Sequence, residues 1–502
     1  MANPLFDALF RPHLDSDRVF LELADGSQWR FREFLVCAAR FANVFTDAGV
    51  KPGDRIAVQI AKSPEALAVY AACVKAGIVF LPLNTAYTAD EVDYFVGDAT
   101  PGVVICDPKN EAALTPVAER HGARLLTLDG AGGGSLPGLA AEVSDRFETR
   151  DRQATDLAAF LYTSGTTGRS KGAMLTQENL LSNAQSLVGY WRFTEDDVLL
   201  HALPIFHTHG LFVASNVCLL AGARMIFLPA FDPDAMIAGL PKATTMMGVP
   251  TFYTRLLDDP RLTKDLVRHM RLFVSGSAPL LAETHIEFEE RTGHRILERY
   301  GMTETNMNTS NPYDGERRAG TVGFPLPQVE LRIADPDTGA AVAQGEIGGI
   351  EVRGPNVFVG YWQMPEKTAE DFREDGFFKT GDLGKIDEDG YVHIVGRSKD
   401  LIISGGYNIY PKEIELLLDE QAGVKESAVI GVPHPDFGEG VVGVLVSAGD
   451  LDTDAVAESI RSRIARFKQP KALFVVDELP RNTMGKVQKN LLRDRYKDIF
   501  AK

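Results

Sequence analysis

Apolar residues in the first part of the chain recur at two alternating spacings, which predict strands and helices in turn. Two short apolar runs around an Asp-Gly pair within residues 18–31 are typical of a β-hairpin, and residues 32–47 carry apolar positions at helical spacing. Strand-like residues 55–60, helix-like residues 64–76 and strand-like residues 78–83 then follow one another. This order predicts a βαβ unit within an α/β layer structure.

The same alternation continues further along the chain. Apolar runs at residues 103–106 and 125–128 predict two more strands. Residues 172–175 indicate another strand, and residues 177–188 indicate a helix for which Thr176 supplies the N-cap hydroxyl. These stretches extend the predicted α/β layers.

The pattern changes twice in the second half. Residues 325–395 contain short strand-like runs separated by Asp-Gly turns, which predict a small β-barrel or a distorted sheet. Beyond Gly396 the pattern of apolar and polar residues changes again. We therefore predict an α/β fold with a large N-terminal lobe, residues 1–396, of layered α/β subdomains plus the small β-barrel, and a small, mobile α+β C-terminal domain, residues 397–502.

Length and charge narrow the class of protein. A chain of 502 residues is too long for one core and predicts about three or four structural units. Its net charge of −17 opposes binding to nucleic acid or to an anionic membrane, although a locally basic site can still bind small anions. Apolar runs stay well short of the roughly 18 residues that cross a bilayer. The start of the chain lacks the basic and apolar regions of a signal peptide, so a cytoplasmic location is expected.

The four cysteines, Cys37, Cys73, Cys106 and Cys218, stand far apart and form no Cys-x-x-Cys pair. This spacing argues against a zinc site and against a disulfide framework. We expect them to be core residues.

Residues 162–172, with the sequence Tyr-Thr-Ser-Gly-Thr-Thr-Gly-Arg-Ser-Lys-Gly, carry the strongest chemical signal. An apolar run at residues 157–162 predicts a buried strand that ends in glycines, hydroxyl side chains and a lysine, a composition suited to phosphate oxygens. A polar turn between two strands is the plain alternative. The Walker loop needs four residues between its glycines and Lys-Ser/Thr at its end, whereas Gly165 and Gly168 are three apart and Gly172 follows Lys171. A P-loop kinase or GTPase is therefore disfavoured.

This string resembles the signature loop of the adenylate-forming enzymes, which include the acyl-CoA synthetases, and six further segments match that family in the same order. The resemblance implies that the loop binds nucleotide through Thr163, Ser164, Gly165, Thr166, Thr167, Gly168 and Lys171. The segment Pro204-Ile-Phe-His-Thr-His-Gly210 is similar to the loop that borders the acyl pocket. Its two histidines lack the carboxylate or cysteine neighbours of a metal site, so metal binding there is disfavoured.

The segments Ser275-Gly-Ser-Ala-Pro279 and Glu298-Arg-Tyr-Gly-Met-Thr-Glu304 resemble the adenine-binding strand ends of the family. Tyr300 is an aromatic that can stack on a purine. Thr303 corresponds to the residue that contacts the α-phosphate, and Glu304 to the magnesium ligand, for which one carboxylate suffices beside phosphate oxygens. The nucleotide-binding residues implied here are Ser277, Ala278, Glu298, Tyr300, Gly301 and Thr303.

The last segments imply roles in ribose binding, movement, CoA binding and catalysis. Asp382 resembles the aspartate that accepts hydrogen bonds from both ribose hydroxyls, with Arg397 as a second ribose contact. Lys399 occupies the hinge position, where many members carry Asp. Gly405 and Gly406 resemble the loop that lines the pantetheine tunnel, and Lys486 matches the catalytic lysine, which stabilises charge in phosphoryl transfer.

The resemblance implies an ATP-dependent acid–thiol ligase that uses ATP, Mg²⁺ and CoA. Carboxylate attacks the α-phosphate of ATP to give an acyl-adenylate and pyrophosphate, and CoA then displaces AMP. Within enzymes, the alternatives are a ligase for another short acid and an adenylating enzyme that loads a carrier protein. Outside enzymes, the alternative is a nucleotide-binding sensor, whose expected loss of Lys486 or Glu304 is absent from the sequence. Acylation of Lys486 as a control is a further possibility.

The acid itself is indicated by Arg299 and by the string Met302-Thr-Glu-Thr-Asn-Met-Asn-Thr-Ser-Asn-Pro-Tyr313, which is similar to the malonyl-CoA synthetases. That resemblance implies malonate, with methylmalonate as a second candidate. Burying malonate's second carboxylate requires a cation or several donors, and Arg299 is the first candidate. An arginine paired with Glu298 or another surface carboxylate is the structural alternative. The remaining implied acid-site residues are His207, Ser277, Thr208, Met302 and Met307.

Overall fold

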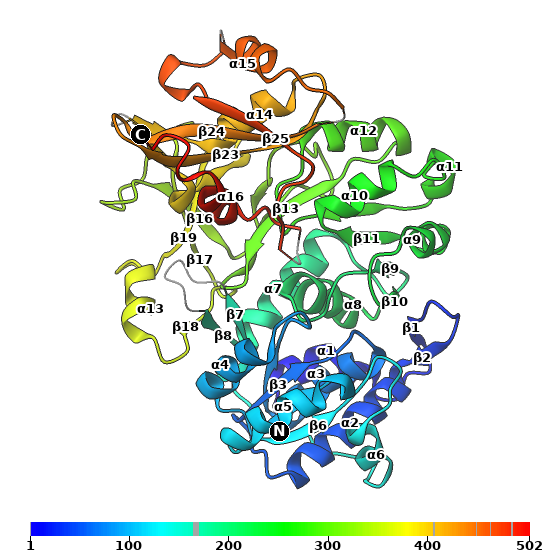
Figure 1. Ribbon diagram of the computed structural model, residues 1–502. Coiled ribbons are helices and arrows are strands. Elements are labelled where there is room, and N and C mark those ends of the chain that lie inside the picture. The colour runs from blue at the N-terminus through cyan, green and yellow to red at the C-terminus, as the bar shows by residue number, and fades with distance from the viewer. Residues whose placement is uncertain are drawn as a thin grey trace. The chain divides into compact units, whose positions relative to one another are not determined.

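The computed structural model describes residues 2–163, 170–404, 407–447, 449–461, 463–482 and 485–501 (Figure 1). Packing divides the chain into two compact units. The first comprises residues Met1–Glu330 and Val352–Phe378, and the second comprises Leu331–Glu351 and Lys379–Lys502. The predicted division at residues 396 and 397 falls within the second unit and stays a prediction.

The first unit contains a seven-stranded sheet with the order β18-β8-β7-β4-β3-β5-β6. Neighbouring strands from β7 to β6 are parallel, whereas β8 is antiparallel to both β7 and β18. In sheet order the strands are Gly360–Tyr361, Lys171–Thr176, Leu157–Thr163, Val79–Pro82, Arg55–Gln59, Val103–Cys106 and Arg124–Thr127. The predicted βαβ unit is therefore confirmed.

The helix between β3 and β4 shows why the sequence folds in this way locally. Helix α3 spans Pro64–Ala76, the residues that the apolar spacing predicts. Ser63 accepts a hydrogen bond from the Ala66 amide at its start, and Gly77 ends it with a φ of +71°. The other helices of this part are α1 (Pro4–Leu9), α2 (Phe31–Asp47), α4 (Ala89–Ala99), α5 (Glu111–Arg120) and α6 (Ser135–Ala141).

A nine-stranded sheet, in the order β15-β14-β13-β12-β11-β9-β10-β1-β2, forms the other layer of the first unit. The six strands from β13 through β12, β11, β9 and β10 to β1 run parallel to their neighbours. The predicted hairpin of β1 and β2 forms one edge of the sheet. In sheet order the strands are Phe324–Pro325, Asn306–Ser310, Leu297–Met302, Leu272–Ser275, Thr245–Gly248, Val198–His201, Arg224–Phe227, Val19–Glu22 and Gln28–Arg30. The helices of this region are α7 (Gln177–Tyr190), α8 (Asn216–Ala221), α9 (Pro233–Gly239), α10 (Pro250–Leu257), α11 (Lys264–Val267) and α12 (Ala282–Thr292).

The second unit contains two further sheets. Strands β16 (Glu330–Ala334), β17 (Gly348–Arg353), β19 (Phe378–Ile386) and β20 (Val392–Arg397) form a four-stranded sheet in this order. This arrangement corresponds to the distorted-sheet alternative of the prediction rather than to the barrel. Helix α13 (Pro365–Asp371) precedes β19 in the chain.

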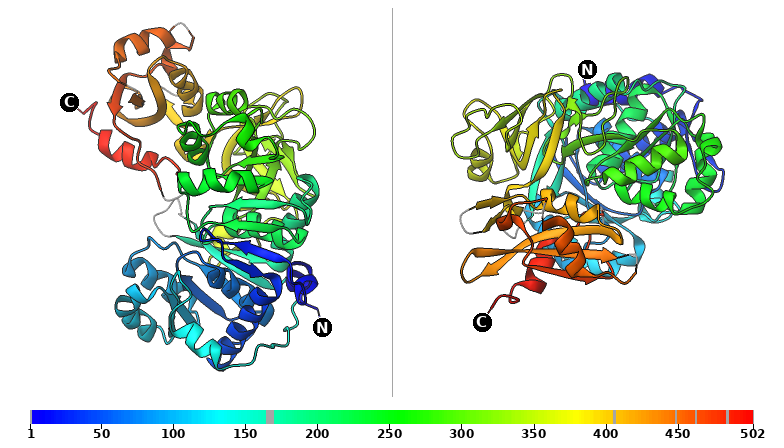
Figure 2. Two further views of the ribbon diagram at one scale, coloured as in Figure 1. Left: turned by 90° about the vertical axis from the view of Figure 1, so that its right-hand side faces the viewer. Right: turned by 90° about the horizontal axis from the view of Figure 1, so that it is seen from above.

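The last residues of the chain form an α+β structure, as predicted. Its sheet consists of β21 (Ile402–Ser404), β22 (Tyr407–Ile409), β23 (Val424–His434), β24 (Gly438–Ser447) and β25 (Ala472–Val476), and its helices are α14 (Pro411–Asp419), α15 (Thr453–Arg461) and α16 (Lys489–Tyr496). Leu492 and Tyr496 of α16 pack into a buried cluster with Ile430 and Val444 of the sheet. Figure 2 shows the red helix α16 beside the orange strands in both of its views.

Across the described residues, the helices are too short or too polar to cross a membrane.

Candidate active site

Two strand ends frame the predicted phosphate loop. Thr163 is the last residue of β7 and Lys171 the first residue of β8, and the two pair across the antiparallel ladder. The predicted residues between them, Ser164, Gly165, Thr166, Thr167 and Gly168, lie outside the described residues. The antiparallel pairing thus brings the first and last members of the predicted loop side by side.

Glu304 lies beside this loop. Its side chain is buried, with 6% of the residue exposed. Its Oε1 accepts hydrogen bonds from the Thr163 hydroxyl at 3.4 Å and from the Tyr361 hydroxyl at 3.2 Å. Two of the residues that sequence reasoning assigned to phosphate and magnesium are therefore in contact, although they are far apart in the chain.

Lys171 contacts Tyr361, the residue that donates to Glu304. Its Nζ lies 4.2 Å from the centre of the Tyr361 ring and 3.8 Å from Asp371 Oδ2, and the residue is 8% exposed. Burial, followed by the charge of Glu304, raises the pKa of Tyr361, so this hydroxyl stays protonated and donates. Sequence reasoning missed Tyr361 and Asp371, because no motif marks them and only the fold brings them to Lys171.

Arg299 is a buried cation on β13. Only 4% of the residue is exposed, and within the described part of the chain its Nε and Nη2 have no hydrogen-bond partner. Desolvation lowers its pKa to about 9, an effect that Tyr253 partly opposes. A buried charge without a partner is costly, and such groups are a common mark of ligand sites.

The strand geometry explains why Arg299 does not pair with its neighbour. Successive side chains of a strand point to opposite faces. Glu298 contacts His285, 3.3 Å from its Nδ1, and accepts a hydrogen bond from the Gly320 amide. The guanidinium of Arg299 instead lies over Gly276, where an added Cβ would overlap it. The structure thus does not support the alternative of an Arg299–Glu298 pair.

Two histidines of the 204–210 segment lie in the electric field of Arg299. Desolvation and the Arg299 charge lower the pKa of His207 to about 4. The same causes, in the same order, lower the pKa of His209. Both imidazoles are therefore neutral at neutral pH, and His207 Nδ1 accepts a hydrogen bond from the His209 amide at 3.4 Å.

His209 connects this segment to the predicted adenine-binding turn. Its Nδ1 lies 3.1 Å from the Ser277 hydroxyl, and Ser277 has a φ of +73°, an uncommon backbone conformation for a serine. Among the described residues its Nε2 has no partner. Sequence reasoning noted the His-x-His spacing but assigned only His207 to the acid, so His209 and Tyr253 are additions from the structure.

The other predicted residues of this region are buried or partly buried. Tyr300 and Met307 are buried, and Gly301 and Met307 pair between β13 and β14. Thr208 is buried, and its hydroxyl has no partner among the described residues. Met302 and Thr303 directly precede Glu304, and Ala278 directly follows Ser277. All three residues are partly buried.

In the second unit, Asp382 and Arg397 face each other across β19 and β20. Arg397 Nε lies 2.7 Å from Asp382 Oδ1, and Asp382 is 3% exposed. The Asp382 amide donates to the Thr380 hydroxyl at 3.1 Å. The two predicted ribose contacts are therefore brought together by strand pairing.

The predicted catalytic lysine lies on a tight loop. The Asn482 amide donates to the Lys486 carbonyl at 2.9 Å, and the Lys486 amide donates to Asn482 Oδ1 at 3.0 Å. Gly485, with a φ of +73°, supplies the left-handed turn that this closure requires. Although Lys486 is exposed as a whole residue, desolvation of its ammonium, followed by repulsion from Arg397, lowers its pKa to about 8.

Lys399 lies between two anchored residues. Arg397 pairs with Asp382 of β19, whereas Asp400 forms an ion pair with Arg493 of α16. Lys399 itself is exposed within the short helix Ser398–Asp400. Gly405 and Gly406, the predicted CoA contacts, lie outside the described residues.

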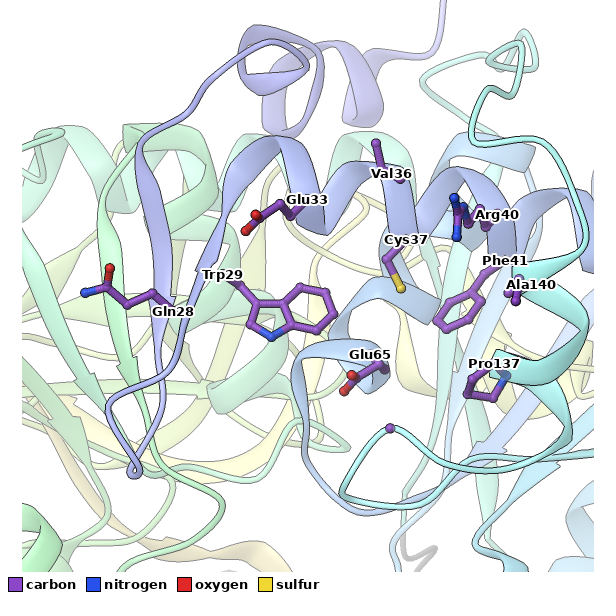
Figure 3. A pocket seen from close by; sticks show the side chains of 12 residues that line it. Gln28, Trp29, Glu33, Val36, Cys37, Arg40, Phe41, Glu65, Pro137 and Ala140 are labelled. Carbon is purple, nitrogen blue, oxygen red and sulfur yellow. The ribbon is translucent and has the colours of Figure 1, made fainter.

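A separate pocket of about 420 Å³ opens in the first unit (Figure 3). It is lined mainly by α2, α6 and the start of α3, and Cys37 lies between Trp29 and Phe41. Burial, followed by the charge of Glu65, raises the pKa of the Cys37 thiol to about 12, so it is not a reactive thiolate. The predicted site residues are not among those that line this pocket.

Comparisons with known proteins identify the family of the chain. The family model described as AMP-binding enzyme matches residues 11–362, and that of the AMP-binding enzyme C-terminal domain matches residues 413–486. The crystal structure of ATP-bound MatB from Rhodopseudomonas palustris has a TM-score of 0.98 and 59% identity, covering 100% of both chains. A feruloyl-CoA synthase from an Amycolatopsis species is 36% identical over 98% of both chains, and a malonate–CoA ligase from Arabidopsis thaliana is 33% identical over 97% of this chain and 88% of its own.

Fold, strand-end chemistry and sequence thus define one class, that of ATP-using enzymes that form adenylates. The chain belongs to the family of AMP-binding enzymes. The resemblance to adenylate-forming enzymes is therefore confirmed.

This family uses ATP, Mg²⁺ and CoA, and the residues present fit the metal. The described residues contain no cluster of three or more His, Cys, Asp or Glu side chains that would form a complete metal cage. Glu304 offers one buried carboxylate beside the Thr163 hydroxyl. Because Mg²⁺ is commonly held by one or two carboxylates plus phosphate oxygens, Glu304 suits an ion that arrives with ATP.

Proposed function

We propose that this protein is a malonyl-CoA synthetase, which joins malonate to CoA through a malonyl-adenylate and releases pyrophosphate and AMP. The observation that carries the proposal is the buried guanidinium of Arg299, whose Nε and Nη2 have no hydrogen-bond partner among the described residues. A second carboxylate on the substrate would provide its missing partner. The relatives' names point to different acids, ferulate in one case and malonate in another, so the chemistry of the site has to decide between them.

The charge of the substrate favours a dicarboxylic acid. When one carboxylate of malonate is adenylated, the other keeps its charge and needs a buried cation. Arg299 supplies that cation, while the neutral His209 and the Ser277 hydroxyl supply hydrogen bonds near it. Acetate and fatty acids lack the second charge and would leave Arg299 unpaired, which sites of this kind discriminate against strongly.

In the first half-reaction, an oxygen of the reacting carboxylate forms a bond to the α-phosphorus of ATP, and the bond from that phosphorus to pyrophosphate breaks. The ammonium group of Lys486 contacts the reacting oxygens and stabilises the negative charge that develops on them. Thr303 contacts the α-phosphate, Lys171 and Thr163 contact the terminal phosphates, and Glu304 would hold Mg²⁺. The metal neutralises phosphate charge when it is bound.

The nucleoside contacts follow the motif positions of the family. Tyr300 stacks on the purine, with Gly301, Ala278 and Glu298 beside it, and Asp382 and Arg397 hold the ribose. In the second half-reaction the CoA thiolate attacks the acyl carbonyl, the bond to AMP breaks, and AMP leaves with the electron pair. The family resemblance assigns Gly405 and Gly406 to the pantetheine arm of CoA.

The direct test measures CoA-dependent AMP production with malonate, methylmalonate, acetate, propionate, ferulate and a long-chain fatty acid. Malonate should have the highest kcat/KM, and acetate should be lower by a factor on the order of 10⁴. Preference for any monocarboxylic acid would refute malonate as substrate while leaving the ligase reaction intact. AMP release that needs a carrier protein, or the absence of turnover with every acid, would favour the carrier-loading enzyme or the nucleotide sensor respectively.

We also propose that Lys399 acts as a hinge between the two half-reactions, because it separates residues anchored to β19 and to α16. Lys399→Pro restricts φ at this position. Adenylate formation should continue, whereas thioester formation should slow by more than about tenfold, the effect of 1.4 kcal/mol on a barrier. Single-turnover assays of each half-reaction measure this, with Lys399→Ala as the control. Unchanged thioester formation in the proline variant would remove Lys399 from this role.

Two further expectations stay predictions: a cytoplasmic location, and acylation of Lys486 as a means of control. The lowered pKa of Lys486 supports the second, because a larger fraction of its amine is neutral and nucleophilic near neutral pH.

A further inference from the structure

A partly buried lysine connects the two sheets of the first unit. Lys62 follows β3 and directly precedes Ser63, the N-cap of α3. Its Nζ lies 2.8 Å from Nδ1 of His201, the last residue of β9, and donates to the His201 carbonyl at 2.9 Å. The same Nζ lies 4.2 Å from the centre of the Phe227 ring. Lys62 thus ties the end of one sheet to the end of the other.

His201 in turn contacts the 204–210 segment. Its Nε2 lies 2.8 Å from the Gly210 carbonyl oxygen. A carbonyl oxygen can only accept, so Nε2 carries the proton, and Nδ1 of the neutral ring is left to accept from Lys62. Desolvation, followed by the nearby charge of Lys62, lowers the pKa of His201 and keeps the ring neutral. By donating to Nδ1, Lys62 supports the tautomer whose Nε2 proton bonds the Gly210 carbonyl.

The Gly210 carbonyl accepts a second side-chain hydrogen bond, from the Ser215 hydroxyl at 2.8 Å. These bonds lie in a π-helical turn, His209–Ser215, a form that is rare and often marks functional sites. Position 210 has no room for a side chain, because an added Cβ would overlap the Pro204 carbonyl. The turn begins at His209, whose imidazole contacts Ser277.

We propose that Lys62 is a positioning residue for the acid substrate: through His201 and the Gly210 carbonyl it fixes the π-helical turn that presents His209 and His207 beside Arg299. The proposal rests on the proposed function in that this region binds the acid. In this proposal Lys62 and His201 lie outside the site and touch neither the acid nor the nucleotide. It predicts an effect on acid binding that is separate from any effect on ATP.

The test replaces Lys62 with methionine, which keeps length and apolar volume but removes the donors. The KM for the acid should rise about tenfold, the cost of losing one hydrogen bond to a charged group, while the KM for ATP stays unchanged. The matched control is Lys75→Met within α3, because Lys75 is a buried lysine that lies 5.1 Å from an aromatic ring, that of Phe6. It should lower the melting temperature to a similar extent without changing the KM for the acid.

A double-mutant cycle separates positioning from general loss of structure. Glutamine in place of His201 keeps a donor for Gly210 without needing a tautomer. Adding Lys62→Met to His201→Gln should therefore change the KM for the acid much less than Lys62→Met does alone. Equal effects in both backgrounds, or equal rises in the KM for acid and for ATP, would overturn the proposal.

Ser215→Ala provides a second route if Lys62→Met does not fold, because it removes the other donor to Gly210. It should raise the KM for the acid severalfold and leave the KM for ATP unchanged, and no change in the KM for the acid would count against the role of this turn. All assays use whichever acid the wild-type enzyme activates best. A preference for an acid other than malonate would therefore refute the proposed substrate without deciding the role of Lys62.

Discussion

Replacing Lys486 with alanine should reduce the rate of adenylate formation on the order of 10²- to 10³-fold, the usual cost of removing one group that stabilises transition-state charge. Its proposed role ends when pyrophosphate leaves, so the conversion of pre-made acyl-adenylate and CoA to thioester should be largely unchanged. Pyrophosphate release and thioester formation, measured separately, report the two steps. Lys497→Ala is a suitable control, because Lys497 is an exposed lysine just beyond α16.

Equal loss in both half-reactions would contradict this assignment of Lys486. The lowered pKa of Lys486, about 8, adds a pH test. Only the protonated ammonium carries the stabilising charge, so kcat/KM for adenylation should fall as pH rises through about 8 and then decrease about tenfold per pH unit. In Lys486→Arg, whatever activity remains should lack this alkaline decline, because the guanidinium keeps its proton. A decline that persists in this variant would assign it to another group.

Replacing Arg299 with methionine should collapse the preference for malonate. Removing one partner of a buried charge pair costs about 2–5 kcal/mol, so kcat/KM for malonate should fall on the order of 30-fold to several thousand-fold. Acetate needs no second cation, and its kcat/KM should stay the same or rise. The ratio of kcat/KM for malonate to that for acetate is the quantity to measure.

Stability provides a second readout for the same variant. A buried cation without a partner destabilises the free protein, so Arg299→Met should raise its melting temperature. The matched control is Arg271→Met, since Arg271 forms an ion pair with the buried Asp197 at 2.7 Å. That substitution should lower the melting temperature and leave the malonate-to-acetate ratio unchanged. An Arg299 variant that keeps its malonate preference would show that another group binds the second carboxylate.

Local signals allowed parts of the fold to be predicted closely from the sequence. Helix α3 has the predicted bounds because its N-cap, Ser63, and its C-terminal glycine, Gly77, lie next to it in the chain. The strands of residues 325–395 were predicted as a barrel or a sheet, because strand order depends on pairing between distant segments, which periodicity does not contain. The arrangement of the small sheet therefore required the structure.

The candidate site divides in the same way. Motif positions such as Glu304, Asp382 and Lys486 could be named from sequence through family resemblance. The contacts of Glu304 with Tyr361 and of His209 with Ser277 join residues 57 and 68 positions apart, and no local pattern encodes them. Whether Arg299 lies in the core or pairs on the surface likewise depended on Gly276 and Tyr253, which belong to other elements.

The absence of a side chain at position 276 has an evolutionary consequence. Even the methyl group of alanine at this position would overlap the guanidinium of Arg299, so Gly276→Ala requires this side chain to move or to be replaced. In a lineage that loses the arginine while changing its acid, the same methyl group no longer meets the guanidinium. The residues accepted at position 276 therefore depend on the residue at position 299, although neither is adjacent to the other in the chain.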